Sequence, residues 1–257
     1  MTVPVDARIL PTADVSRARV FINRFLFRGM LFTMGVIAVA LYRLVPDKNV
    51  AWRFAKAQAR NLCRLCGVHV HVRGIERLGR GPYVFTPNHQ SHFDIAALLG
   101  YLPGNNRFAT KKELFRQPVL GTVLRTLGMI PVDRENPNAR TTLLEQIRRT
   151  GFSTIIFPEG TRSHDGRLLP FRKGAFVTAI ELGLPVVPVV CKGTRQVMPK
   201  GRYLSIFPGE VEIMILDPIA TSEMTYDDRD GLSGLVRELI GDELAKPYSA
   251  AVSSGSA

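Results

Sequence analysis

The chain of 257 residues has only three cysteines, Cys63, Cys66 and Cys191. Cys63 and Cys66 form a C-x-x-C motif, but no second pair follows, which argues against a structural zinc site. A redox pair is expected at the start of a helix that follows a strand, whereas these two lie late in an expected helix. We therefore expect half-buried thiols in a reducing compartment.

The sequence also has no run of 20 apolar residues without a charge, which is the usual length of a membrane-spanning helix. Its longest uncharged apolar stretch is 29–42, which has 14 residues between Arg28 and Arg43. Adding 25–27 places Arg28 inside the stretch, where arginine can snorkel to the interface. The segment 38–40 resembles a signal-peptide cleavage site, but the region before it is long and irregular. We expect an uncleaved helix that spans the membrane or lies in its surface.

Acidic residues are almost absent from 17–64, which holds ten Lys/Arg and one acid, Asp47, and so carries +9 of the net charge of +12. Such a basic segment indicates a polyanionic partner, either an anionic membrane or a nucleic acid. RNA binding favours aromatic side chains between basic ones on a sheet face, and only Trp52 and Phe54 lie in the basic helix. We expect an anionic membrane surface as partner and no nucleic acid.

A basic amphipathic helix is predicted over 51–66. Its basic residues recur at helical spacing beside an apolar stripe: Arg53, Lys56, Arg60 and Arg64, against Trp52, Ala55, Ala59, Leu62 and Cys66. Two interpretations are open, a membrane-surface helix or a helix packed on the domain with a solvated charged face. The neighbouring apolar run at 25–45 favours a hairpin in or on the bilayer, with the turn at Pro46-Asp47.

From Val68 onward, alternating strand and helix patterns predict an α/β fold with a mixed, partly parallel sheet flanked by helices. We expect an N-terminal membrane-associated helical segment at 1–66, an α/β domain at 67–248 and a disordered tail at 249–257. The strands are expected at 68–72, 82–87, 108–110, 129–133, 153–158, 185–191 and 211–216, and the helices at 95–101, 113–127, 140–150, 175–182 and 231–244. His69 and His71 share one face of the first strand, where we expect solvated side chains, not a metal pair.

The first chemical motif is Asn88-His-Gln-Ser-His-Phe-Asp94. A carboxylate can fix the tautomer of a histidine base, so Asp94 is expected to orient His89 and also to cap the helix that follows. Ser91 lacks the G-x-S-x-G context of a nucleophile, and His92 is expected to point elsewhere. A histidine base without a protein nucleophile suits direct attack by a substrate hydroxyl on an activated acyl group.

The second motif, Phe157-Pro-Glu-Gly-Thr-Arg-Ser163, follows an expected buried strand. Arg162 can form a bidentate fork on phosphate, Gly160 permits close backbone approach, and the Thr161 hydroxyl can donate. The alternative is a strand-end turn with a surface pair between Arg162 and Glu159. Further basic residues lie near expected strand ends, and each taken alone is expected to be a solvated charge: Lys111, Lys112 and Arg134.

The two motifs together resemble those of the 1-acylglycerol-3-phosphate acyltransferases in the glycerolipid acyltransferase family. The first family block matches Asn88, His89 and Asp94. The others match, in order, 111–115 with Gly128, Ile130 and Arg134; 157–163 with Phe171, Lys173 and Gly174; and 187–189. The resemblance covers 82–190, extends to the N-terminal hairpin only in kind, and hardly includes the residues after 220.

The resemblance implies that His89, oriented by Asp94, deprotonates the 2-hydroxyl of lysophosphatidate. That hydroxyl would attack the thioester of acyl-CoA or acyl carrier protein and give phosphatidate. It further implies an acceptor-binding role for Glu159, Gly160, Thr161 and Arg162, with Arg162 on the phosphate and with Lys111 and Arg134 lining the same region. No metal or organic cofactor is implied, and the expected location is the cytoplasmic face of the cell membrane.

Two alternatives stay open on the sequence. One is acyl transfer to another lyso-lipid, such as lyso-ornithine lipid or a lysophosphoglyceride, because a single arginine does not fix the headgroup. The other is a non-catalytic peripheral membrane-binding protein, to which the basic segment alone points.

Overall fold

The computed structural model describes residues 16–47, 49–133, 139–201 and 205–248. The strands are β1 (Val68–Arg73), β2 (Val84–Pro87), β3 (Asn106–Lys111), β4 (Ile130–Val132), β5 (Ser153–Ile155), β6 (Val186–Lys192) and β7 (Gly209–Ile215). The α-helices are α1 (Arg17–Leu44), α2 (Asn49–Leu65), α3 (Phe93–Tyr101), α4 (Pro118–Thr126), α5 (Ala139–Thr150), α6 (Gly174–Leu182), α7 (Thr194–Val197) and α8 (Arg229–Ala245), with short 3-10 turns η1 (Ile75–Arg77), η2 (Lys112–Arg116) and η3 (Tyr226–Asp228).

The strands form one seven-stranded sheet in the order β1-β7-β6-β2-β5-β3-β4. Every pair of neighbours is parallel except β6 and β7, which are antiparallel. β2, β5 and β3 lie side by side and run in the same direction, so their carboxyl ends meet at one edge of the sheet. The expected mixed, partly parallel sheet is therefore confirmed, and each expected strand occurs within a few residues of its predicted bounds.

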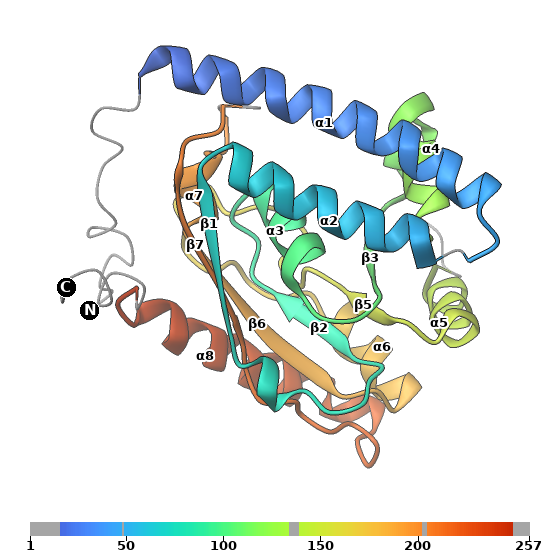
Figure 1. Ribbon diagram of the computed structural model, residues 1–257. Helices are drawn as coiled ribbons and strands as arrows, with labels where there is room; N and C mark the ends of the chain where they lie inside the picture. Colours follow the sequence, from blue (N-terminus) through green and yellow to red (C-terminus); the bar gives the residue numbers. More distant parts are fainter. Residues whose placement is uncertain (1–15, 48, 134–138, 202–204, 249–257) are drawn as a thin grey trace.

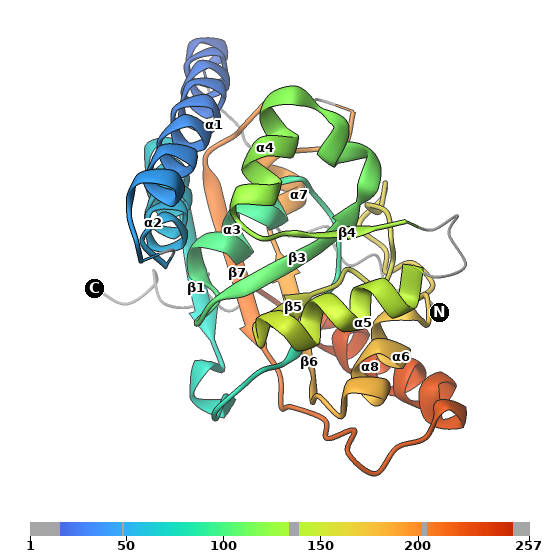
Figure 2. The same cartoon turned by 90° about the vertical axis from the view of Figure 1, so that its right-hand side faces the viewer.

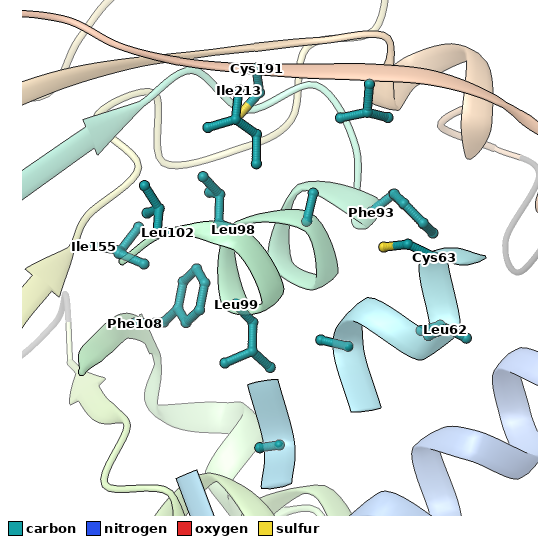
Figure 3. Close-up of a cluster of buried hydrophobic side chains, with 14 of the residues drawn as sticks. Leu62, Cys63, Phe93, Leu98, Leu99, Leu102, Phe108, Ile155, Cys191 and Ile213 are labelled. Carbon is teal, nitrogen blue, oxygen red and sulfur yellow. The ribbon is translucent and has the colours of Figure 1, made fainter. Parts of the chain in front are cut away.

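Helices cover both faces of the sheet (Figures 1 and 2). α2 and α3 lie on one face, and α6 and α8 lie on the other with a smaller apolar cluster of their own. On the first face the core surrounds α3, where Leu98 and Leu99, with Leu102 directly after the helix, meet side chains of α2 and of several strands (Figure 3). The strands β2 and β6 are buried along their whole length, so their sequences read as nearly continuous apolar runs.

The helix α2 packs on this domain, which corrects its interpretation as a membrane-surface helix. Trp52 is only 2% exposed, and the rest of the apolar stripe is buried beside α3 and β1: Ala55, Ala59, Leu62 and Cys66. Two of the basic side chains form hydrogen bonds within the protein. Lys56 donates to the carbonyls of Leu102 and Gly104, and Arg60 donates to the carbonyl of Gly100. Their charges thus cap the carboxyl end of α3.

The helix α1 is joined to the domain along one narrow face. Asn23 is fully buried and donates its side-chain amide to the carbonyls of Cys66 and Ile206. Gly35 lies so close to α4 that an added Cβ would be 2.8 Å from a methyl group of Val123. The rest of α1 is largely exposed and apolar, with Phe21, Phe25 and Phe32 each about 60% exposed. By length and composition, α1 is the one helix among the described residues that is able to cross a membrane.

The three cysteines are free and fully buried, deeper than the half-buried position expected for them. Burial raises the pKa of the Cys63 thiol to about 12, so it stays protonated. His71 Nε2 lies 2.7 Å from a carboxylate oxygen of Glu210 at the surface, and the described residues contain no cluster of three metal-ligating side chains. The expected disordered tail at 249–257 lies outside the described residues.

Candidate active site

Both motifs lie at the sheet edge where β2, β5 and β3 end. The first motif begins directly after Pro87, the last residue of β2, and the second begins two residues after Ile155, the last residue of β5. Open α/β sheets bind their ligands at this edge. A backbone hydrogen bond from Ser163 to the carbonyl of His89, 2.9 Å long, joins the two motif loops directly.

His89 and Asp94 form a hydrogen-bonded pair, with 2.7 Å between His89 Nδ1 and Asp94 Oδ2. The Asp94 side chain is fully buried and that of His89 is 13% exposed. The His89 ring also stacks on Phe157, with ring centroids 4.0 Å apart. This contact from the second motif holds the plane of the imidazole, and Nε2 is left as the nitrogen for a substrate.

Asp94 does not cap the helix that follows, so that expectation is wrong. The helix α3 begins at Phe93 and its N-cap position is His92. The Asp94 carboxylate turns back toward the loop instead, where Oδ2 also accepts hydrogen bonds from the backbone N–H groups of Gln90 and Ser91. One carboxylate oxygen therefore organises the loop and meets the histidine at the same time.

Glu159 belongs to the second motif, and its buried side chain hydrogen bonds to the backbone of the first. Its Oε1 accepts from the backbone N–H of His89 at 2.6 Å, and its Oε2 accepts from that of Leu169 at 2.9 Å. Burial raises the pKa of this carboxyl to about 7, although both hydrogen bonds favour the charged form. Both carboxylate oxygens thus accept from the backbone, and the carboxyl is buried, whereas the alternative of a surface pair with Arg162 placed it at the surface.

Asn88 and Ser91 are held by backbone partners. The Asn88 side chain donates to the carbonyl of Cys191 and accepts from its N–H, which clamps the end of β2 to β6. Ser91 Oγ donates to the carbonyl of Met198 and accepts from the N–H of Phe93, so the hydroxyl is used in hydrogen bonds that hold the loop. Neither side chain is arranged as a nucleophile beside His89.

The second motif forms a turn beside His92. Gly160 has a positive φ of 67°, which glycine adopts without strain, and Thr161 is exposed. Arg162 is partly buried, and its carbonyl accepts a hydrogen bond from Lys200. Burial together with the nearby charge of Arg162 lowers the pKa of His92 to about 4, so the arginine is the cation of this pair of neighbours.

The remaining expected residues lie at the end of β3 or outside the described ranges. Lys111 is the exposed last residue of β3, on the same sheet edge as His89. Lys112 pairs with Asp133 at 2.6 Å. Arg134 lies outside the described residues.

Sequence reasoning missed three contributors to this site: Phe157, Gln90 and Lys200. Phe157 is part of the second motif, but a sequence does not show that two loops bring an aromatic ring onto an imidazole. The backbone N–H of Gln90 donates to Asp94 Oδ2, and the Lys200 side chain donates to the carbonyl of Arg162. Because such contacts involve backbone atoms, which every residue has, the residue types in the sequence do not predict them.

Chemically, the edge offers a histidine whose Nδ1 is held by a buried carboxylate and a neighbouring arginine. The first can accept the proton of a hydroxyl, and the second can bind phosphate. A model of the acyltransferase family matches residues 69–192, which include both motifs, so acyltransferases are the class of protein that this chain resembles.

The curated relatives narrow this class. A 1-acyl-sn-glycerol-3-phosphate acyltransferase of Saccharomyces cerevisiae is 34% identical over 249 residues, which are 90% of this chain and 82% of the relative. The chain therefore belongs to the 1-acyl-sn-glycerol-3-phosphate acyltransferase family. A chloroplastic member from Brassica napus is 39% identical over 59% of this chain, which spans only 45% of that relative's length.

A solved structure supports the same assignment. The crystal structure of the 1-acyl-sn-glycerophosphate acyltransferase PlsC from Thermotoga maritima is similar with a TM-score of 0.77 and 27% identity. The similarity covers 90% of this chain and 97% of that one. The N-terminal helices are thus part of the shared fold, where the sequence had suggested a likeness only in kind.

Proposed function

We propose that this protein transfers a fatty acyl group from acyl-CoA or acyl carrier protein to the sn-2 hydroxyl of 1-acylglycerol-3-phosphate, giving phosphatidate. The observation that carries this proposal is the 2.7 Å hydrogen bond between His89 Nδ1 and the buried Asp94 carboxylate, beside Arg162 and at the sheet edge. Family membership supports the acceptor, since the relatives are named for it.

In the proposed mechanism, Asp94 keeps the proton of His89 on Nδ1, so that Nε2 accepts the proton of the acceptor hydroxyl. The hydroxyl oxygen attacks the thioester carbonyl as its proton moves to His89. The tetrahedral intermediate collapses, the carbon–sulfur bond breaks, and the imidazolium returns its proton to the leaving thiolate. An ester forms, a thioester breaks, and His89 ends neutral, so no further reactant is needed.

Arg162 is the proposed ligand of the acceptor phosphate, with the turn at Gly160 and Thr161 beside it. The guanidinium lies near His92 and on the loop that hydrogen bonds to the His89 backbone, which supports a phosphate close to the reacting hydroxyl. Lys111 at the end of β3 is a second proposed contact, because its charge is on the same edge. Glu159 supports the site through the backbone of His89, so we propose that it positions the base.

The exposed apolar face of α1 is the proposed membrane contact. Asn23, Phe27, Gly35 and Ala38 are buried against the rest of the protein along much of α1, so a helix standing across the bilayer would lose these contacts. We propose that α1 lies in the surface of the cytoplasmic leaflet. Basic residues near its amino end add about 1 kcal/mol each on an anionic surface. We also propose a boundary between the N-terminal hairpin and the α/β domain at 66/67, with α2 packed into a core that the two parts share.

The test is acyl transfer from labelled acyl-CoA to lysophosphatidate in detergent or liposomes, with the wild type beside His89→Ala. We expect phosphatidate from the wild type only, with both proteins folded in the absence of urea. Activity in both would reject His89 as the base. If neither transfers from acyl-CoA, repeating with acyl carrier protein and with lyso-ornithine lipid or lysophosphoglycerides identifies the donor or acceptor that was wrong.

A further inference from the structure

A second concentration of positive charge lies away from the His89 site, around a cavity of about 290 Å³. The cavity is bounded by the amino end of α2, the start of β3, and the carboxyl ends of α4 and α5. Its lining includes three arginines, Arg107, Arg125 and Arg149, and shares no residue with either motif. A neighbouring cavity of about 440 Å³ is lined by Arg125 and Arg149 as well, and by Lys112.

Arg107 is the unusual member of this cluster, because it is buried and forms no ion pair with any of the described residues. It is 7% exposed, and its guanidinium lies between two aromatic rings, 4.3 Å from Trp52 and 4.1 Å from Phe152. The rings cover its faces, so only its edges can bind a ligand. One edge donates to the carbonyl of Asn106, while Nε is buried and has no hydrogen-bond partner.

Gly128 packs close to this unpartnered nitrogen. A Cβ added to Gly128 would lie 3.0 Å from Arg107 Nε, and the φ of 67° at this position also favours glycine. Among the described residues, no aspartate or glutamate lines either cavity. Burial without a carboxylate lowers the pKa of Arg107 to about 10, a cost that a bound anion would offset.

We propose that the cavity at Arg107, Arg125 and Arg149 binds a phosphate group, as a site separate from the acceptor site at Arg162. Guanidinium groups match phosphate with parallel N–H donors, and three of them neutralise a dianion. The phosphate has two possible sources, a lipid headgroup of the membrane and a soluble phosphate ester. Tyr42 and Asn49, at the turn between α1 and α2, also line the cavity, so it opens next to the proposed membrane contact.

The chain contains a built-in reporter for this site. Trp52 is the single tryptophan of the sequence, it lines the cavity, and it stacks on Arg107. A ligand that binds the guanidinium should therefore change tryptophan fluorescence in a saturable way. The full-length protein in detergent micelles would be titrated with inorganic phosphate at constant ionic strength, and separately with phosphatidate and with phosphatidylcholine mixed into the micelles.

The matched variants are Arg149→Gln and Arg148→Gln. These neighbours are both exposed on α5, but Arg149 lines the cavity whereas Arg148 donates to the carbonyl of Glu181. We expect R149Q to weaken phosphate binding about tenfold or more, because it removes one charge-assisted contact, and R148Q to leave it unchanged. Arg107→Met serves as a second variant only if it folds, so R149Q decides the test.

Arg162→Ala separates this proposal from the proposed function. We expect R162A to keep the fluorescence response even where it loses acceptor binding. A response to inorganic phosphate assigns the site to soluble phosphates, and a response to phosphatidate alone assigns it to lipid headgroups. The proposal is overturned if no phosphate probe gives a saturable response, if chloride gives the same response, if R149Q and R148Q bind equally, or if R162A abolishes the signal.

Discussion

A single carboxylate oxygen in this protein meets three donors. Asp94 Oδ2 accepts from His89 Nδ1 and from the backbone of Gln90 and Ser91, at 2.7 to 3.0 Å. The sequence predicted the pairing of His89 and Asp94, because a base needs an acid that holds it. It also suggested the wrong second role, the helix cap, since residue types do not show which way a carboxylate turns.

Asp94→Asn tests the charge at nearly constant shape. The amide oxygen can keep the backbone N–H contacts, but it cannot stabilise an imidazolium as a carboxylate does. We expect kcat to fall about 10²-fold or more, with KM for the acceptor nearly unchanged. Steady-state kinetics would measure this, with the exposed Asp242→Asn on α8 as the control. A large rise in KM at full kcat would show that Asp94 serves binding.

Glu159 predicts a pH dependence of stability. Its pKa of about 7 in the folded protein lies above its ordinary value of 4.5, so the unfolded chain ionises first as pH rises. The free energy of unfolding should therefore fall between pH 4.5 and about 7, by up to roughly 3 kcal/mol relative to Glu159→Gln, which has no such titration. Urea unfolding across this range in micelles would measure it. If the free energy of unfolding changed with pH in the same way for both proteins, the raised pKa of Glu159 would be rejected.

At the scale of elements, the helices α1 and α2 show where sequence patterns stop being informative. The apolar residues of α2 recur with the helical period of 3.6, and they correctly predicted a helix. The same apolar stripe can face either a membrane or a protein core, so it did not predict which of the two α2 contacts. Trp52, Ala59 and Leu62 face the core because α3 presents a matching surface, and this is a tertiary fact. The strands β2 and β6 were easier to predict, because burial on both faces leaves short apolar runs with few alternatives.

The hydrogen bonds of Asn23 should contribute measurably to the packing of α1 on the rest of the protein. Asn23→Ala leaves the carbonyls of Cys66 and Ile206 without these donors, which should lower the free energy of unfolding by about 1 to 3 kcal/mol. Thr33→Ala on the same helix is the control, because the Thr33 hydroxyl bonds only within α1, and its effect should stay within about 0.5 kcal/mol. Equal effects of the two variants in urea unfolding would contradict the attachment by Asn23.

On the scale of the whole molecule, apolar exposure is concentrated on one side. α1 and α4 present it, with Val119 and Leu120 of α4 adding to the phenylalanines of α1, while α8 lies on the opposite side (Figure 1). The overall charge of +12 and its N-terminal concentration were readable from the sequence. The sequence did not show which helix carries the exposed apolar face, because that depends on which apolar residues are buried in the core.

Phe32→Asp tests this orientation. Phe32 is 59% exposed on α1, and Leu235 is 45% exposed on α8. F32D should reduce binding to anionic vesicles about tenfold or more, since it removes a phenylalanine from the apolar contact and adds repulsion. Leu235→Asp introduces the same charge on the other side and should bind as the wild type does. Co-sedimentation with vesicles measures both, and equal losses would argue against α1 as the contact.

The exposed face of α1 also has a consequence for how reactants and enzyme meet under the proposed function. A protein held at the lipid surface encounters its acceptor by lateral diffusion in two dimensions, and phosphatidate leaves by the same route. The rate then follows the mole fraction of lysophosphatidate in the surface, while its amount per volume of solution matters little. Inert lipid mixed into the same bilayer acts as a diluent, and the composition of the membrane becomes the effective substrate concentration.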